Sequence, residues 1–499
     1  MTRRGVWWAC FGLVLLMCIG LFMYLSPSQT LLSDSDTTLI INEINRQHDP
    51  WRWFHHDWPL DNHFYRPLVS ELFELELRLH PHDGYKWGLT SDLLAAITTL
   101  GLFWLLRELT DNPLVSTLSA GLFVLWQVNA GFWLTHLSVY AAGLTLVVGL
   151  WRQRRHPATL RVADRAVSLY IRKGRRPFGV QVRTMAAILG RTLGAGGKTL
   201  AVVLPAVLLW YWLGTYELGG FKFLGFRMLA WIPGRTASSM TVFAFVALAA
   251  FARYMRLLPR RAAPATALDT PKTRSSEAPS TQMPGIGWPL LAVLASALAL
   301  LCYEQAVMIP PILGLVGLTW YYRGAIGRWW LWGVPFALPV AAYLLVRYAV
   351  IPHTPTFYWQ EQHKTTGHAI QTLMLYLFPV WAPFDEVKFL LLQSTSLFYL
   401  SLTPWICVFE TVAAANALWQ MRRRWILAGF GWLASTLAFA PMAWFKEFEH
   451  YHYWSMAFRA FFDVMMAWIA LDLTVIAFSP RARQAPPRLV PAPGSLPRP

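Results

Sequence analysis

Carboxylates and histidines are concentrated in one polar segment near the N-terminus. Residues 31–68 read LLSDSDTTLIINEINRQHDPWRWFHHDWPLDNHFYRPL and follow a long apolar run. Carboxylates and imidazoles are the side chains that most often transfer protons or bind metal ions in proteins. This segment is therefore the first candidate for a reactive site, and the acids Asp34 and Asp36 stand at its start. A structural role for Asp34 is also open, because Asp is a favoured helix N-cap and a short helix is predicted to begin near Thr37.

The histidines of the segment raise the question of a metal ion. The side chains of His55, His56, Asp57 and His63 are ligand types suited to zinc or manganese. Their spacing matches no zinc motif such as HExxH, and neighbouring side chains in a loop need not point in the same direction. We therefore predict no cofactor and no metal centre, with these four residues as the ligands if a divalent ion does bind.

The elements that position this segment are predicted to be membrane-spanning helices. The chain has 499 residues, of which 56% are hydrophobic, including 27 Trp and 30 Phe. Its apolar residues form long runs, and about 20 such residues are needed to cross roughly 30 Å of hydrocarbon. We predict an all-α polytopic membrane protein with about 12 transmembrane helices. These are residues 7–25, 88–107, 113–128, 132–150, 199–216, 235–252, 287–303, 305–322, 329–351, 396–420, 425–443 and 456–478.

The distribution of Lys and Arg predicts the orientation of these spans. The formal net charge is +17, and residues 152–198 alone hold twelve Lys and Arg against one acid, Asp164. Clusters of this kind fall at the ends of alternate spans, as the positive-inside rule requires of cytoplasmic loops. We therefore predict an integral protein of the plasma membrane with both termini in the cytoplasm and no nucleic-acid partner.

The predicted spans form two membrane halves joined by a polar linker. The stretch 370–384 is predicted to be an interfacial helix, because a further crossing there would place Arg422–Arg424 outside. Pro, Ser and Thr dominate the linker and Pro is frequent in the tail, compositions typical of disorder. The predicted parts are residues 1–263, the N-terminal half with the large first outer loop 26–86 and the basic cytoplasmic insertion 152–198; 264–286, the linker; 287–479, the C-terminal half; and 480–499, the cytoplasmic tail.

Four motifs along the chain carry a resemblance to a known family. They are the first-loop run from Asp34-x-Asp36 to Tyr65-Arg66-Pro67-Leu68, then Cys302–Pro310, Tyr343–Tyr348 and Glu449–Ser455. Together they resemble the GT-C superfamily of polytopic membrane glycosyltransferases, most closely the bacterial relatives of membrane protein O-mannosyltransferases, without the C-terminal helical repeats. The chain departs from that pattern at Ser35, which separates the acids, at Tyr303 in place of a lysine and at His450 in place of an arginine. The resemblance implies a GT-C-like fold in a bacterial inner membrane.

The resemblance also implies a sugar transfer at the outer face of the membrane. In this family the donor is a sugar on a polyprenyl phosphate, and an acceptor hydroxyl attacks its anomeric carbon with inversion. A carboxylate in the first outer loop takes up the proton of that hydroxyl. Asp36 is the first choice for this base, because its spacing to Ile40 fits the second acid of the family pair, and Asp34 is the reserve.

The departing lipid phosphate requires cationic or donor groups nearby. The resemblance and the predicted depth in the membrane favour Arg347, His450 and Arg459 for this role. Structural roles for both arginines stay open. Arg347 is placed to extend to the interface, and Arg459 is placed to pair with Asp463, four residues further on.

Four further residues are expected beside the acceptor or behind the reactive groups: Asp57, Tyr65, Arg66 and Glu304. Glu304 falls at a predicted outer turn between two spans. It either orients the acceptor or holds an arginine of the first loop such as Arg66, and we favour the ion pair.

Two other classes of protein share the polytopic layout. A transporter or lipid flippase performs no covalent chemistry, but its site is expected near the membrane midplane, whereas most ionisable residues here are predicted at the outer face. A non-catalytic GT-C relative that acts as a scaffold is the other alternative. The leading prediction is a membrane glycosyltransferase whose partners are a polyprenyl-phosphate sugar, membrane lipid and a glycan or protein acceptor.

Overall fold

The computed structural model describes residues 3–24, 29–47, 49–60, 62–128, 229, 231–259, 285–325, 327–354, 363–377, 422–445 and 449–478. All regular elements in these ranges are helices, beside one isolated antiparallel bridge between His363 and Phe445. The chain divides into two compact units, residues 1–135, 220–397 and 426–465 and residues 136–219, 398–425 and 466–499. Nearly all of the described residues belong to the first unit, which contains the site considered below.

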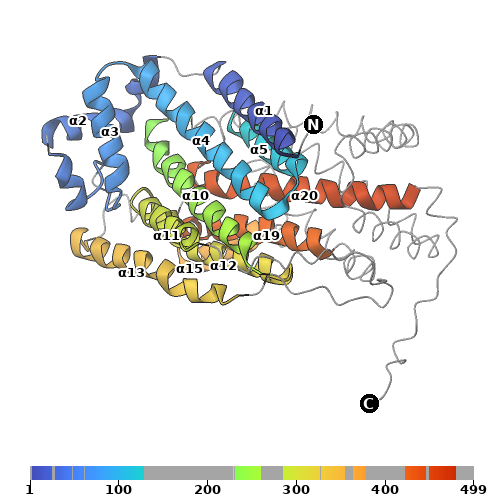
Figure 1. The fold of residues 1–499 in the computed structure, drawn as a ribbon. Coiled ribbons are helices and arrows are strands. Elements are labelled where there is room, and N and C mark those ends of the chain that lie inside the picture. The colour runs from blue at the N-terminus through green and yellow to red at the C-terminus, as the bar shows by residue number, and fades with distance from the viewer. Residues whose placement is uncertain are drawn as a thin grey trace, which may run out of the picture. The chain divides into compact units, whose positions relative to one another are not determined.

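The N-terminal spans pack around a shared apolar core. Three helices contact one another here: α1 (Arg3–Tyr24), α4 (Gly84–Thr110) and α5 (Pro113–Gln127) (Figure 1). The buried side chains between them are almost all apolar, with Phe103 of α4 against Trp7 of α1. Helices that are apolar over most of their length are expected to be buried in this way or to face lipid.

The helix α10 (Arg235–Leu257) packs between the N-terminal and the C-terminal spans. It packs along α4 on one side and against α11 (Gly287–Leu300) and α12 (Ile309–Tyr322) on the other. α4 and α10 approach closely at Gly101, where an added Cβ atom would lie 2.9 Å from the Cβ of Phe245. The two helices can approach this closely because glycine has no side chain, since protein interiors are already close-packed.

Three more helices complete the C-terminal part. α13 (Gly333–Val350) contacts α11, and α19 (Arg422–Phe439) and α20 (Tyr453–Phe478) end the described residues. A shorter helix, α15 (Thr366–Leu377), forms the first part of the predicted interfacial helix. Residues 378–384 lie outside the described ranges, and the depth of α15 in a membrane stays a prediction.

Five helices in the described ranges are long and apolar enough to cross a membrane: Arg4–Phe22, Gly84–Thr110, Ile232–Leu257, Trp329–Val350 and Arg424–Trp444. α5 and α11 are apolar but shorter. These helices support the predicted all-α membrane protein. Of the twelve predicted spans, nine overlap helices and three lie outside the described residues, at 132–150, 199–216 and 396–420. The count of twelve therefore stays a prediction, as do the insertion 152–198, most of the linker and the tail, which also lie outside.

The predicted first outer loop is itself folded. It contains two short turns of 3₁₀ helix and two amphipathic helices, α2 (Ser35–Gln47) and α3 (Pro67–Leu79), which lie at one end of the spans (Figure 1). Ile40 and Ile44 of α2 and Phe73 of α3 are buried, and so are the acids Glu74 and Glu76 of α3. The burial of these apolar faces gives the polar segment a fixed conformation.

Candidate functional site

A buried ion pair joins the outer loop to the turn between α11 and α12. Arg66, the residue before α3, donates from Nε (2.9 Å) and Nη2 (2.8 Å) to Oε2 of Glu304. Glu304 begins the short 3₁₀ helix η4 (Glu304–Met308). The two side chains are 9% and 18% exposed, so water screens the pair only weakly. The predicted ion pair between Arg66 and Glu304 is confirmed.

Aromatic rings surround the guanidinium of Arg66. Its Cζ atom lies 4.1 Å from the ring centre of Phe64, 4.4 Å from that of Tyr303 and 5.4 Å from that of Trp58. Rings at these distances attract a cation. Burial lowers the pKa of Arg66, but the charge and hydrogen bonds of Glu304 together with Tyr303 and Tyr451 outweigh burial, and the pKa is raised overall. Arg66 is therefore a fixed cation that holds the loop in place and does not exchange protons.

The C-terminal end of α13 contacts the same loop segment. Tyr343 donates its hydroxyl to the backbone carbonyl of Tyr65 (3.2 Å), and the two ring centres are 5.9 Å apart. One turn later, Arg347 donates from Nη2 to the backbone carbonyl of His63 (3.2 Å). The structure therefore brings Arg347 close to the segment of Tyr65 and Arg66, from two of the predicted motifs, as the site prediction requires.

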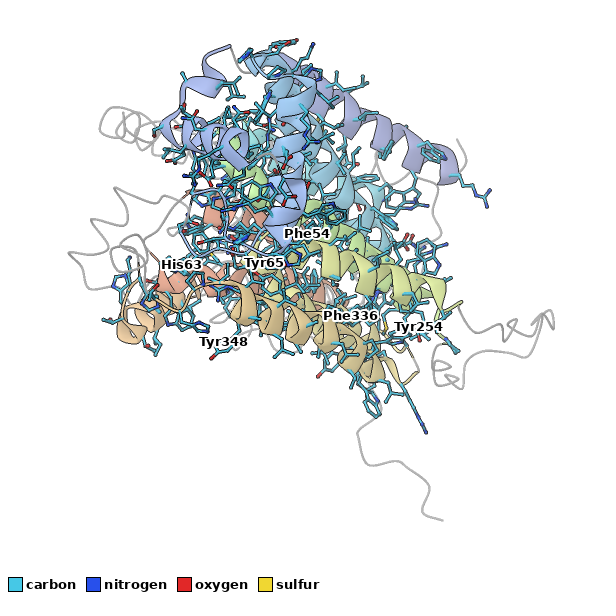
Figure 2. All side chains as sticks on the ribbon, turned by 90° about the vertical axis from the view of Figure 1, so that its left-hand side faces the viewer. Phe54, His63, Tyr65, Tyr254, Phe336 and Tyr348 are labelled. Atoms are coloured by element: carbon cyan, nitrogen blue, oxygen red, sulfur yellow. The ribbon has the colours of Figure 1, made fainter. Side chains whose placement is uncertain are left out.

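Tyr65 also fixes the segment 63–68 through its own side chain. Its hydroxyl donates to the backbone carbonyl of Phe54 (3.2 Å), and Figure 2 shows the two residues close together. The backbone N–H of Leu68 donates to the carbonyl of Leu301 at the end of α11 (3.1 Å). Burial raises the pKa of Tyr65, so the phenol remains a hydrogen-bond donor at neutral pH. Residues 63–68 are thus held by the preceding 3₁₀ turn, by α11 and by α13.

Asp57 stabilises the turn that precedes this segment. Its Oδ1 accepts the backbone N–H of Trp58 (2.7 Å), and its Oδ2 accepts that of His63 (2.6 Å). His63 has φ of 63°, a left-handed conformation that non-glycine residues seldom adopt. The carboxylate of Asp57 offsets the cost of that conformation, which explains an acidic residue here without a reactive role.

The metal candidates do not gather around a common centre. Among the residues that the structure describes, no group of three or more His, Cys, Asp and Glu side chains is arranged to hold a metal ion. His55 and His56 are exposed, while the Nε2 of His63 lies 4.0 Å from Oδ2 of Asp57. The geometry of these residues therefore favours an ordered turn over a metal site.

The two acids at the start of the segment have different positions in α2. Oδ2 of Asp34 accepts hydrogen bonds from the backbone N–H (3.1 Å) and the hydroxyl (3.2 Å) of Thr37. The predicted N-cap role of Asp34 is thus confirmed, and α2 begins at Ser35, two residues before Thr37. Asp36 lies in the first turn of α2 and is half-buried. A carboxylate in the first turn of a helix is stabilised by the helix dipole. Asp34 has a structural role as the cap, so Asp36 stays the predicted catalytic base.

The late motif approaches the ion pair through Gln305 and Tyr451. The amide of Gln305, next to Glu304, donates to the backbone carbonyl of Tyr451 (2.8 Å), and Tyr451 contributes electrostatically to the raised pKa of Arg66. His450 is buried, with its ring centre 4.4 Å from that of Tyr451 and 5.0 Å from that of Trp231. His450 therefore directly precedes and contacts the residue, Tyr451, that links the late motif to Gln305.

Arg459 lies further along α20. Its side chain is 2% exposed, and its Cζ is 4.7 Å from the ring centre of Phe462. The side chain of Asp463 lies outside the described residues, so the predicted pair with Arg459 stays a prediction. The predicted role of Arg459 at the lipid phosphate also stays a prediction.

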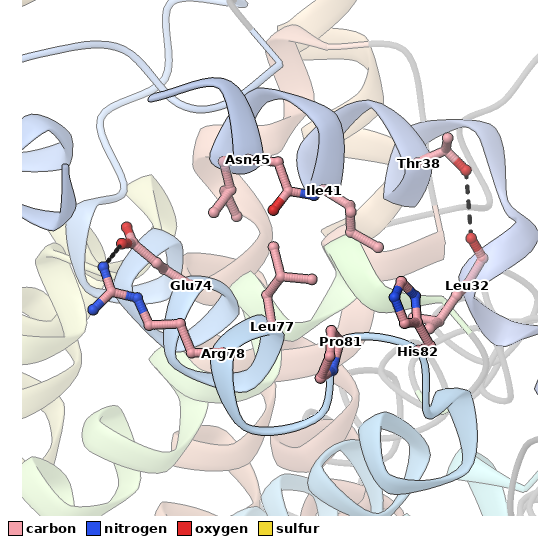
Figure 3. A pocket seen from close by; sticks show the side chains of 10 residues that line it. Leu32, Thr38, Ile41, Asn45, Glu74, Leu77, Arg78, Pro81 and His82 are labelled. Carbon is pink, nitrogen blue, oxygen red and sulfur yellow. Dashed lines mark hydrogen bonds and ion pairs between the residues drawn. The ribbon is translucent and has the colours of Figure 1, made fainter. Parts of the chain in front are cut away.

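Two pockets are lined by residues of the outer loop. The α2–α3 pocket has a volume of about 490 Å³, and in Figure 3 Ile41 and Asn45 of α2 face Leu77 of α3, with His82 at the far end. The α2–α13 pocket has a volume of about 500 Å³ and is lined by α2, by residues 52–60 and by Val350 and Pro352 at the end of α13. Among the predicted site residues, Asp57 lines the α2–α13 pocket.

A second buried ionic cluster was not predicted from the sequence. Arg235, at the start of α10, is fully buried and pairs with Glu76 of α3. It also donates from Nε to the Ser91 hydroxyl (2.9 Å) and from Nη2 to the backbone carbonyl of Trp87, both in α4. The sequence does contain one indication of this cluster. Glu76 falls on the buried apolar face of α3, in the run LFELELRL. A charged residue at such a position usually has a buried partner.

These observations define a helical membrane-type protein with a folded polar loop fixed to its spans by two buried ion pairs. Comparison of the chain with protein-family models, with curated proteins and with solved structures found no match.

Proposed function

We propose that the protein is an integral-membrane glycosyltransferase of GT-C type in a bacterial inner membrane. It moves a sugar from a polyprenyl-phosphate donor to an acceptor hydroxyl at the outer face, with inversion, and both of its termini face the cytoplasm. One observation carries the proposal. The Arg66–Glu304 pair, with Arg347 beside it, brings together the first outer loop, the turn after α11 and the end of α13. These are three of the four motifs on which the resemblance to this family rests.

In the proposed reaction the acceptor oxygen forms a bond to the anomeric carbon. The bond between that carbon and the phosphate oxygen breaks, and polyprenyl phosphate departs with the bonding electrons. The acceptor proton passes to the carboxylate of Asp36, with Asp34 as the reserve base. A base in the first turn of a helix just outside a span is suited to a reaction at the head of a membrane lipid.

The departing phosphate is held by Arg347, with His450 and Arg459 contributing donors. Arg347 supports this role because its Nη2 is fixed on the His63 carbonyl, while its buried Nε has no hydrogen-bond partner among the described residues. Oε1 of Glu304 is likewise buried without a hydrogen-bond partner in the described part of the chain. It is therefore suited to orient the acceptor hydroxyl while Oε2 holds Arg66.

The positions of the buried charges favour this proposal over a transporter. Arg235 and Glu76 lie at the outer-loop end of α10, and Glu108 with Arg253 and Arg256 lies at the opposite ends of α4 and α10. Binding sites of secondary transporters are instead expected near the membrane midplane, where helices are interrupted. α4 and α10 continue without a break between the two clusters.

The test uses purified protein in lipid nanodiscs with radiolabelled polyprenyl-phosphate sugars and an envelope fraction as the acceptor. We expect sugar transfer by the wild type and a loss of about 100-fold or more in Asp36→Asn, the contribution typical of general-base catalysis. Asp34→Asn should keep its activity, because Asn caps helices as well as Asp does. Asp83→Asn, a matched change at the N-cap of α4, controls for loss of an outer acid.

Two results would decide against these assignments. Full activity in both Asp36→Asn and Asp34→Asn would show that neither acid is the base. Absence of transfer from every donor tested, with folded protein, would refute the transferase function itself.

A further inference from the structure

We infer that the α2–α13 pocket binds a saccharide, and that this saccharide carries the acceptor hydroxyl. The first part concerns binding alone, and the second rests on the proposed transferase function. The pocket takes side chains from α2, from residues 52–60 and from the end of α13. Its volume of about 500 Å³ is within the range of small-molecule sites.

The pocket combines apolar walls with a polar rim. Leu39, Trp53, Trp58 and Val350 form apolar parts of the lining, and Asn42 and Arg52 are among its polar members. A purely apolar ligand such as an acyl chain would leave the polar groups of the rim without water or partners. A saccharide offers hydroxyl groups to the rim and C–H faces to the walls, so it matches both kinds of surface.

The charges of the pocket balance. Arg46 pairs with Glu43 at 2.9 Å, Arg52 lies within electrostatic range of Glu43, and Asp57 is bound by backbone N–H groups. Burial raises the pKa of Glu43, but hydrogen bonds from Arg46 and Gln47 outweigh it and the pKa is lowered overall, so Glu43 is ionised. Two arginines thus face two carboxylates, an arrangement that favours a neutral polar ligand over a phosphate.

The pocket is connected directly to the proposed phosphate site. Asp57 lines it and holds the backbone N–H of His63, whose carbonyl receives the hydrogen bond of Arg347. Val350, in the lining, follows Arg347 by three residues on α13. A saccharide in the pocket therefore lies beside the groups that would hold the departing phosphate, where one of its hydroxyls can reach the donor sugar.

α2 offers a matched pair of substitutions. Asn42 and Asn45 are both exposed and lie three residues apart, but Asn42 lines the α2–α13 pocket and Asn45 lines the α2–α3 pocket. Their replacement by Ala changes the helix equally and removes a polar group from a different pocket in each case. Arg52→Gln is the second variant in the α2–α13 pocket.

The experiment measures binding of neutral oligosaccharides of two to four hexose units, released by mild acid from the envelope of the producing cells. Saturation-transfer NMR on the full-length protein in nanodiscs reports binding, and the Asp36→Asn background prevents turnover. We expect Asn42→Ala and Arg52→Gln to weaken binding about five- to tenfold each, the loss expected for one hydrogen bond, and Asn45→Ala to leave it unchanged. Thermal unfolding of each variant confirms that it is folded.

Each outcome has a separate meaning. Three results overturn the pocket assignment, whatever the transferase assay shows. In the first, no oligosaccharide binds; in the second, all three variants bind equally. In the third, a Ser/Thr-rich peptide or inorganic phosphate binds in place of the oligosaccharides. Saccharide binding that depends on Asn42 and Arg52, without transfer from any polyprenyl-phosphate sugar, keeps the pocket but overturns the acceptor role and the proposed function. Binding and transfer that are lost together in Asn42→Ala support both.

Discussion

Replacing Glu304 with Gln tests whether the ion pair with Arg66 fixes the outer loop on the spans. The substitution keeps the size of the side chain but leaves the guanidinium of Arg66, which is 9% exposed, without a counter-ion. Breaking a buried pair by removing one partner costs about 3–5 kcal/mol. Because Glu304 is 18% exposed, we expect the lower limit, about 3 kcal/mol. The aromatic rings around Arg66 cannot replace a full negative charge.

The measurement is the free energy of unfolding in mixed micelles, followed by circular dichroism as the SDS fraction is raised. The exposed pair Arg46–Glu43 supplies the control, since Arg46 is 71% exposed and Arg46→Met should cost about 0.5 kcal/mol. In the double variant Arg66→Met with Glu304→Gln, the loss should be about 2 kcal/mol smaller than the sum of the two single losses. Additive losses, or a loss in Glu304→Gln no larger than in Arg46→Met, would refute the inferred coupling.

Two further predictions concern the charge balance of α3 and the packing of α4. Burial and the neighbouring charge of Glu74 raise the pKa of Glu71 to about 7, so the folded state favours the protonated acid and loses stability as pH rises from the ordinary value of 4.5 through 7. Glu71→Gln should remove this pH dependence of the free energy of unfolding, measured at pH 5 and pH 8. An unchanged pH dependence in the variant would contradict the prediction. Gly101→Ala should destabilise by about 1–3 kcal/mol, because its Cβ would lie 2.9 Å from that of Phe245. Gly12→Ala, which meets nothing within 4 Å, should be neutral or slightly stabilising in the same assay, and equal losses would show that packing is not the cause.

Much of the fold was predictable because its signals are local. A run of about 20 apolar residues identifies a candidate span without knowledge of its partners. The cap at Asp34 and the short helix that follows it are equally local, and the sequence indicated both. The ion pair between Arg66 and Glu304 was predicted across 238 residues because the predicted order of the spans put both residues at the same face.

The remaining features depend on contacts between distant segments. Asp57 and His63 are ligand types for a metal, yet in the structure the Asp57 carboxylate accepts backbone N–H groups, because His63 adopts a left-handed conformation that no local pattern indicates. Arg235 was placed at the start of a span, but nothing in the sequence pairs it with Glu76, 159 residues earlier. The α2–α13 pocket also joins segments that are far apart in the chain, since Val350 and Pro352 line it together with residues of the loop.

The two buried ion pairs act on the same helix, and this determines how a substrate can enter. Arg66 immediately precedes α3 and Glu76 lies in its last turn, so α3 is held to η4 at one end and to α10 at the other. Opening α3 as a lid would expose or separate both pairs, at a cost of several kcal/mol for each. α3 is therefore a fixed part of the loop, and under the proposed function the acceptor enters a pocket that already exists. The α2–α13 pocket meets that requirement, because Val350 and Asp57 in its lining belong to segments that the Arg347–His63 contact holds together.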